Sequence, residues 1–233
     1  MVEKSTAVKI LGYHTALFYD EQLPDGIKIL NPFRESQTVR DITLSFYQRF
    51  YDDENTRQLI LGINPGRLGA GATGIPFTDS KRLIENCGLP DPGFTTYEPS
   101  SVFIYDMIEA YGGVSSFYER FYINSVFPLA LVQEKTKGKI VNYNYYDDVN
   151  LQKSLTPFIV QHIRTQLTFV KNTDVIFCLG RGKNFVFLDQ LNKIHGFVNQ
   201  IVPLEHPRFI MQYKLKTKDQ YIDQYLETFT RYR

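Results

Sequence analysis

The sequence predicts an α/β protein, a three-layer α/β/α sandwich with a central four-stranded parallel sheet. Two observations lead to this fold class. Short apolar runs of strand length alternate along the chain with longer segments of helical periodicity. Each apolar run also stops at glycine, proline or a polar residue, as strands buried on both faces commonly do. A chain of 233 residues suits one core, so we expect residues 1–233 to form a single domain.

The N-terminal part of the chain is expected to be mostly helical. Apolar side chains recur with helical spacing over residues 7–19 and again over residues 36–51. The second of these helices has the apolar positions of a helix packed on a sheet. Between them, residues 26–33 form a short extended piece that Pro32 ends.

The first predicted strand covers residues 59–63 and leads into the glycine-rich stretch GINPGRLGAGATGIPF at 62–77. Pro65 has no N–H for a sheet ladder, and it biases Asn64 before it toward an extended conformation. The strand should therefore end at the Asn64 amide, although Asn-Pro is also a common start of a turn. A helix is expected to follow at about 79–87.

The rest of the chain continues the alternation of helices and strands. After a proline-rich loop at 89–99 we expect a helix at 101–111 and the second strand at 121–127, which Pro128 ends. Residues 135–146 are polar and aromatic and are expected to form a hairpin or a loose loop. The elements expected after them are a helix at 151–170, a strand at 174–179, a helix ending near 194, a strand at 198–204 and a last helix at 217–232.

The composition excludes several classes of protein. The net charge of +1 excludes a wholly basic nucleic-acid binder, so such a role must depend on a local patch. Two cysteines cannot supply a four-thiolate zinc or iron–sulfur site, and we expect neither a metal nor a cofactor. No apolar run has the length of a membrane span, and the N-terminus lacks the apolar core of a signal peptide. We therefore expect an intracellular protein, in the cytoplasm and nucleoid or in the nucleus, with no membrane partner.

Each predicted strand ends in a residue with a possible role in binding: Asn64, Asn124, the segment Gly180-Arg181-Gly182, and His206. Because the carboxyl ends of parallel strands share one edge, and ligands bind at that edge, we expect these residues to meet. Asn124 lies within an apolar run, where it is either a buried amide satisfied by backbone or the partner of a polar ligand. An amide presents a donor and an acceptor side by side, which matches the imide edge of a pyrimidine.

Aromatic and basic residues accompany these strand ends. Phe77 is either a core residue or a ring that stacks on a base. Arg181 and Lys183 stand at a helix start, where backbone N–H groups favour phosphate. Basic residues exceed acidic ones by three over residues 203–218, where Phe209 and Tyr213 are interleaved. This mixture fits a nucleic-acid strand, with an ordinary solvated surface as the alternative.

Together these residues resemble the uracil-DNA glycosylase superfamily, and within it a divergent second type of the single-strand-selective monofunctional branch. The stretch at 62–77 resembles the first motif of that branch, and INSVFPLAL at 123–131 its central motif. VIFCLGRG at 175–182 is similar to its third strand, and HPR at 206–208 to the start of its second catalytic motif. The segment after His206 is shorter than is usual in the branch. The residue that fills the gap left by a flipped base is therefore open among Arg208, Phe209 and Ile210.

The resemblance implies a role for each matching residue. Asn64 would position the attacking water and His206 would donate a hydrogen bond to O2 of the departing base. Phe77 would stack on the base and Asn124 would read its imide edge. The remaining residues implied around the base are Gly62, Ile63, Pro65 and Gly66, where Gly66 leaves room beside C5, and those implied to contact DNA are Gly180, Arg181, Lys183, Pro207, Arg208, Phe209 and Lys214.

The activity that the resemblance implies is that of a monofunctional DNA glycosylase in base excision repair. Such an enzyme flips uracil out of single- or double-stranded DNA, releases it by hydrolysis and leaves an abasic site. Modified uracils and deaminated purines are further candidate substrates, and we expect a monomer. GINPG contains no carboxylate, so activation of the water should be weak. The alternatives are a non-catalytic nucleic-acid-binding module on the same fold and a nucleotide-binding α/β enzyme, whose P-loop signature is absent.

Overall fold

A computed structural model describes residues 5–232 of the chain. Its central sheet consists of four parallel strands in the order β3-β2-β6-β7. In register, Ile60 in the middle of β2 pairs with Ile123 on one side and Phe177 on the other. This sheet confirms the predicted fold class. The strands are β2 (Arg57–Gly62), β3 (Phe121–Ser125), β6 (Lys171–Leu179) and β7 (Gln200–Leu204).

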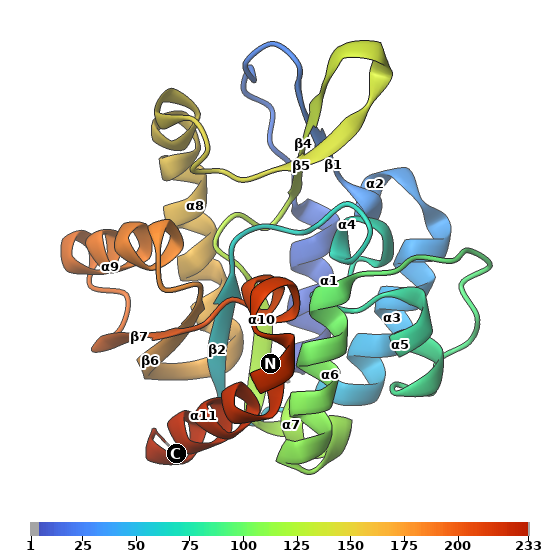
Figure 1. Ribbon diagram of the computed structural model, residues 1–233, viewed down its shortest axis with the longest axis vertical. Coiled ribbons are helices and arrows are strands. Elements are labelled where there is room, and N and C mark those ends of the chain that lie inside the picture. Colours follow the sequence, from blue (N-terminus) through green and yellow to red (C-terminus); the bar gives the residue numbers. More distant parts are fainter. Residues whose placement is uncertain (1–4, 233) are drawn as a thin grey trace.

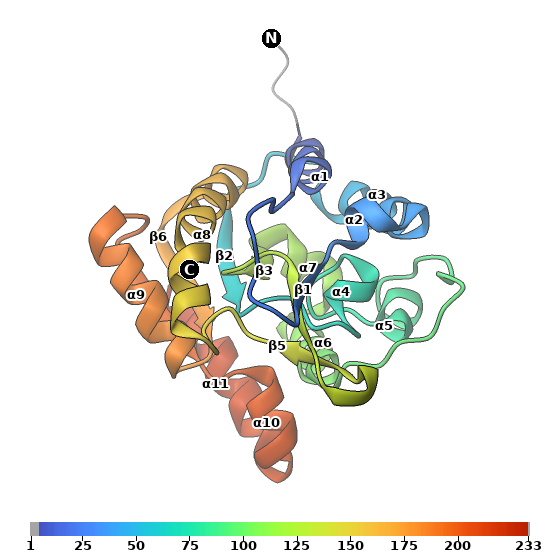
Figure 2. The same ribbon diagram turned by 90° about the horizontal axis from the view of Figure 1, so that it is seen from above.

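Helices cover both faces of this sheet, as Figures 1 and 2 show. Phe121 and Tyr122 are neighbours in β3, so their side chains point to opposite faces. Phe121 contacts Phe229 of α11 (Lys218–Arg231), with ring centroids 4.5 Å apart. Tyr122 contacts Phe169 of α8 (Val149–Val170), with centroids 5.7 Å apart. The two aromatic contacts therefore belong to two different helical layers.

Every helix expected from the periodicity of the sequence is present. Besides α8 and α11, the expected helices are α1 (Thr6–Ala16), α3 (Gln37–Tyr51), α5 (Ser80–Glu85), α6 (Pro99–Tyr111) and α9 (Lys183–His195).

None of the helices among the described residues is both long and apolar enough to cross a membrane.

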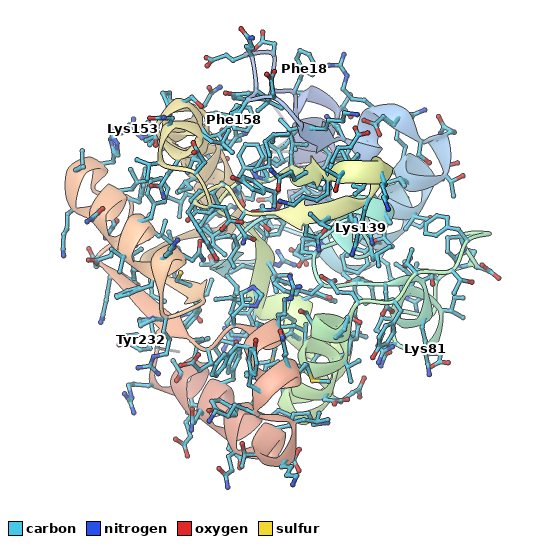
Figure 3. The ribbon with its side chains drawn as sticks, turned by 45° about the horizontal axis from the view of Figure 1, so that its top comes forward. Phe18, Lys81, Lys139, Lys153, Phe158 and Tyr232 are labelled. Atoms are coloured by element: carbon cyan, nitrogen blue, oxygen red, sulfur yellow. The ribbon has the colours of Figure 1, made fainter. Side chains whose placement is uncertain are left out.

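A second, antiparallel sheet was not predicted. It has the order β1-β4-β5, with β1 at Ile27–Leu30, β4 at Ala130–Glu134 and β5 at Ile140–Tyr143. The extended piece at 26–33 thus becomes an outer strand of this sheet. Residues 135–146, expected to form a hairpin or a loose loop, hold the turn and the second strand of a hairpin whose first strand is β4. Lys139, labelled in Figure 3, lies at the end of its turn. The pairing of β1 with β4 joins segments about a hundred residues apart, which no local pattern reveals.

Four short α-helices among the described residues were also missed, because each is too short for periodicity to be visible. The segment after His206 is the most important of them, since it was interpreted only as the end of a strand. Pro207 occupies the first helical position there, where proline fits well, and His206 is the N-cap. The missed segments are α2 (Pro32–Glu35), α4 (Ala70–Thr73), α7 (Gly113–Arg120) and α10 (Pro207–Tyr213).

Candidate active site

An open cleft of about 550 Å³ lies where the chain leaves β2 and β7 at their carboxyl ends. This volume is within the range of small-molecule sites. The loop after β2 forms one wall and α10 forms another. The third group of side chains comes from β5 and from the residues directly after it. The residues that line the cleft include Ile63, Asn64, Pro65, Gly66, Phe77, Glu98, Asn142, Asn144, Tyr146, His206, Arg208, Phe209 and Tyr213.

The Asn64 amide joins the loop after β2 to the second sheet. Its Nδ2 donates to the carbonyl of Tyr143 at 3.0 Å, and its Oδ1 accepts from the N–H of Tyr145 at 3.3 Å. An amide oxygen can accept two hydrogen bonds, so Oδ1 keeps one acceptor position for a further partner. The orientation of Asn64 is therefore set by the end of β5 and by the residues that follow it.

Phe77 also lines the cleft and has an unusual backbone conformation. Its φ is 52°, in the left-handed region that a bulky residue rarely adopts, and such backbone strain is concentrated at functional sites. The ring packs on Gly62, where a Cβ would lie only 3.0 Å from the ring carbon Cζ. Glycine at position 62 therefore allows the ring to occupy this place.

His206 reaches the same cleft from the start of α10. Its ring centroid lies 6.1 Å from that of Phe77, and its Nδ1 accepts a hydrogen bond from the N–H of Arg208 at 3.1 Å. Loss of hydration and, second, the Arg208 charge lower the pKa of His206 to about 4. The imidazole is therefore neutral at pH 7. Because Nδ1 is the acceptor, the proton is on Nε2, which is thus a hydrogen-bond donor.

Glu98 brings a carboxyl group into the cleft, which the sequence analysis did not foresee. Its Oε2 is fully buried and has no hydrogen-bond partner among residues 5–232. A Cβ at Gly69 would lie only 2.0 Å from Oε2, and one at Gly66 only 3.1 Å from Oε1. Burial and, second, the nearby Asp79 charge raise the pKa of Glu98 to about 7, against the opposing effect of Arg208.

The only sequence signal near Glu98 is Pro99. Proline favours the first position of a helix, so Glu98 could have been recognised as the residue before α6. No pattern connects this position with the glycine-rich stretch. The contact depends on the course of the loop at 89–99.

Asn124 does not line the cleft with Asn64 and His206. Its side chain is only 4% exposed. Its Nδ2 donates to the Tyr122 hydroxyl at 2.7 Å, and its Oδ1 accepts from the N–H of Ser125 at 2.8 Å. It lines a separate small cavity of about 10 Å³ that shares Pro65 with the cleft. In this arrangement the protein itself satisfies the amide.

The residues expected to contact DNA surround the cleft at varying distances. Arg208 and Phe209 line it and are exposed, whereas Ile210 is fully buried and cannot enter a gap in a base stack without rearrangement. Pro207 is buried at the start of α10. The exposed Lys214 follows α10 directly.

Tyr213, which was noted only as part of the basic and aromatic mixture, stands beside Phe209 with ring centroids 5.6 Å apart. It is 65% exposed.

The segment after β6 lies beside the cleft rather than in its wall. Gly180 has a φ of 112°, and a Cβ there would lie 3.8 Å from Cδ2 of His206. Arg181 is paired with Glu205, with Nε and Oε1 3.6 Å apart. Nζ of Lys183 lies 5.9 Å from the ring centroid of Tyr146, which does line the cleft. This segment therefore packs beside His206 and adds positive charge at the margin of the cleft.

Comparisons with known proteins identify the class to which this fold and cleft belong. The model of the uracil DNA glycosylase superfamily matches residues 48–230. The chain belongs to that superfamily. No curated protein matches the chain significantly.

Among solved structures, the chain is similar to wild-type SMUG2 of Pedobacter heparinus. The two share 50% sequence identity over 99% of this chain and 98% of that chain, with a TM-score of 0.95. The resemblance to a second type within the single-strand-selective branch is thus confirmed. Membership of the superfamily also makes DNA the partner and glycosylase-type hydrolysis the class of activity.

Proposed function

We propose that this protein is a monofunctional DNA glycosylase that hydrolyses the bond between uracil and deoxyribose and leaves an abasic site. The observation that carries the proposal is the meeting of Asn64, Phe77 and His206 on one open cleft. These are the residues to which the resemblance assigns water positioning, base stacking and stabilisation of the leaving group. Their placement on one cleft supports a shared role in one reaction.

The reaction begins when the target nucleotide leaves the base stack and its base enters the cleft against the ring of Phe77. Breaking the N-glycosidic bond leaves negative charge on the base, spread over N1 and O2. The Nε2–H of His206 donates to O2 and holds this charge. One preorganised donor of this kind is worth about 3–4 kcal/mol in the transition state.

The attacking water adds to C1′ of the sugar, and its proton ends on the released base. The free acceptor position on Asn64 Oδ1 holds this water. A neutral amide is a weak base, so stabilisation of the departing base contributes the larger part of the rate. With no lysine nucleophile assigned, the products are free uracil and an intact strand with one abasic site.

Asn124 has a proposed role that requires a local rearrangement. To read the imide edge of the base, its amide would exchange one of its bonds, to Tyr122 or to Ser125, for the base. Around the cleft, Arg208, Phe209 and Lys214 are proposed to hold the DNA strand, with Arg181 and Lys183 at the margin. The context of this activity is base excision repair.

The test is incubation with single- and double-stranded oligonucleotides that each carry one uracil, followed by alkaline cleavage of abasic sites. We expect strand breaks only at the uracil position and only after alkali. Asn64→Ala should reduce the rate about a hundredfold, because the water loses its position. Failure of the wild-type protein to release uracil, or full activity of the variant, would contradict the proposed function.

A further inference from the structure

The turn that joins β4 to β5 is rich in lysine. Its sequence is Lys135-Thr136-Lys137-Gly138-Lys139, and all five residues are exposed. The acidic neighbour Glu134 is already paired with Lys28 of β1, with Nζ and Oε2 2.6 Å apart. Asp25 adjoins Gly26, whose carbonyl accepts from the N–H of Glu134 at 2.9 Å. With both carboxylates counted, the four lysines leave an excess of two positive charges at this end of the hairpin, in a chain whose net charge is +1.

The stability of the hairpin does not explain these lysines. The N–H of Lys135 donates to the carbonyl of Lys139 at 2.8 Å, so two like charges stand opposite each other, which is an unfavourable cross-strand pair. Lys137 has a φ of 65° and Gly138 a φ of 73°. Asparagine, aspartate and glycine suit a positive φ better than lysine does. The turn therefore carries its positive charge at a cost to folding, and a bound polyanion would relieve the repulsion.

The other end of the same hairpin belongs to the cleft. Asn142 of β5 lines the cleft, and its Oδ1 accepts from the N–H of Arg67 in the loop after β2 at 3.0 Å. Tyr143, the last residue of β5, accepts from Asn64. A strand rises about 3.3 Å per residue, so Lys139 stands about 10 Å from Asn142 along the strand direction. Figure 1 shows the hairpin reaching outward from the rest of the molecule.

Positive charge therefore flanks the cleft on two sides. Arg208 of α10 lines it, and the exposed Lys214 follows α10 directly. The lysine-rich turn continues the wall that β5 forms. A DNA strand that crosses the cleft from the α10 wall to the β5 wall would meet basic side chains before and after it.

We propose that the lysine-rich turn of the β4–β5 hairpin is a second DNA-binding element, which binds phosphates of the strand on one side of the flipped nucleotide. Successive phosphates of one strand are about 3.4 Å apart along a duplex axis, so the turn reaches phosphates about three or more nucleotides from the nucleotide in the cleft. Contacts to phosphate add affinity without a sequence preference. This inference rests on the proposed function, which places the flipped nucleotide in the cleft.

The test uses a hairpin variant of the full chain that carries Lys135→Gln, Lys137→Asn and Lys139→Gln. Asparagine tolerates a positive φ, so the change at residue 137 preserves the turn. A control variant removes the same amount of charge at three exposed residues near the amino ends of β3, β6 and β7, which is the edge of the parallel sheet opposite the cleft. Its changes are Arg120→Gln, Arg164→Gln and Lys193→Gln.

Fluorescence anisotropy with a single-stranded oligonucleotide that lacks uracil measures binding over a range of salt concentrations. Each phosphate contact contributes about −0.7 to the slope of log K against log salt, so loss of three contacts should make the slope less steep by about 2. We expect the hairpin variant to bind at least about tenfold more weakly than the wild type at about 0.1 M salt, and the control variant to bind within about twofold. The rate of uracil release at saturating protein should stay the same, because the lysines touch no reacting atom.

A second measurement tests on which side of the cleft the turn acts. Two substrates carry uracil about two nucleotides from the 5′ end or from the 3′ end, closer than the turn can reach. On one of them the hairpin variant should release uracil as fast as the wild type at subsaturating protein, because the phosphates that the turn binds are missing. On the other substrate the deficit of the variant should remain.

The outcomes distinguish this proposal from the proposed function. Equal affinity and equal salt slopes for the folded hairpin and control variants would overturn the second DNA-binding element and leave the lysines the role of keeping the hairpin from pairing with other chains. A deficit of equal size on both end-labelled substrates would overturn the placement of the turn on one side of the cleft. Absence of uracil release by the wild type would overturn the proposed function, while the binding measurement on uracil-free DNA would still decide whether the turn binds DNA. Thermal unfolding checks that both variants are folded.

Discussion

The Nδ1 atom of His206 accepts a hydrogen bond from the backbone N–H of Arg208, two residues further along the chain, at 3.1 Å. This bond is the N-cap of α10, so the start of a short helix determines which nitrogen of the imidazole carries the proton. The neighbouring Arg208 charge also disfavours the imidazolium form. The result is a neutral donor whose Nε2–H is available to the cleft.

His206→Ala should therefore lower the rate of uracil release about 10²–10³-fold, the typical effect of removing one preorganised donor. The measurement is single-turnover release from a uracil oligonucleotide. His195→Ala is the control, since His195 lies at the end of α9 and does not line the cleft. A His206→Ala rate within a factor of three of the wild type would exclude His206 from leaving-group stabilisation.

Asn124→Ala tests whether the buried Asn124 amide binds the base or only stabilises the fold. If Asn124 reads the base, the rate of uracil release should fall about a hundredfold in Asn124→Ala. The variant should also lose about 1–3 kcal/mol of stability, because two buried hydrogen bonds are removed. Tyr122→Phe removes only the hydroxyl that accepts from Asn124, and it should leave the rate within about threefold. Denaturant unfolding and single-turnover kinetics on both variants make the distinction. An Asn124→Ala protein that is less stable but fully active would show a structural role alone.

Gly66→Tyr should abolish the tolerance of substituents at C5. The backbone at Gly66 is not in the left-handed region, so the substitution is sterically accessible to the main chain. Its Cβ would press on Oε1 of Glu98 and the ring would fill the space beside C5. We expect release of 5-hydroxymethyluracil to fall at least tenfold more than release of uracil. Gly12→Ala, in the open middle of α1, is the control, and an unchanged ratio in Gly66→Tyr would contradict the orientation of the base.

Phe209 and Tyr213 should act as a stacking surface for DNA bases next to the cleft. They stand one helical turn apart on α10 and are 39% and 65% exposed. Stacking on an aromatic side chain is worth about 1–3 kcal/mol per base, so Phe209→Ala should weaken binding of single-stranded DNA at least about fivefold. Fluorescence anisotropy with an oligonucleotide that lacks uracil measures this effect. Ile194→Ala, an exposed apolar residue of α9, should bind as the wild type does.

The pKa of Glu98 makes the stability of the protein depend on pH. The folded value of about 7 exceeds the ordinary 4.5, mainly through burial and the Asp79 charge, while Arg208 acts in the opposite direction. Between these values the folded chain keeps a proton that the unfolded chain has released. The contribution of Glu98 to stability is therefore present below pH 4.5 and is lost as the pH rises through 7.

Glu98→Gln removes this titration. The free energy of unfolding of the variant, measured relative to that of the wild type, should therefore increase as the pH rises from 5 to 8. This increase should be at most about 3 kcal/mol. Urea unfolding at the two pH values measures it, and the exposed Glu85→Gln should show no such change. An equal difference at both pH values would mean that Glu98 does not titrate in this range.

The parallel sheet and the edge on which the site lies were predictable because both depend on local patterns. Apolar runs that stop at Asn64 and near His206, separated by helices, are sufficient to bring these two residues to one edge of a parallel sheet. Phe77 belongs to the same glycine-rich stretch as Asn64, so its position near Asn64 could also be predicted from the sequence. In each case the information lies within a few residues of the position concerned.

Other features depended on contacts between distant segments, and only the tertiary structure decided them. The contact of Glu98 with the Gly66–Gly69 turn, the second sheet that supplies Asn142, and the partners that satisfy Asn124 all follow from the path of the chain between elements. The short helix α10 exposes Phe209 and Tyr213 while burying Ile210. Local periodicity carries no information on such pairings, because they are set by how the elements pack and not by the residues next to them in the chain.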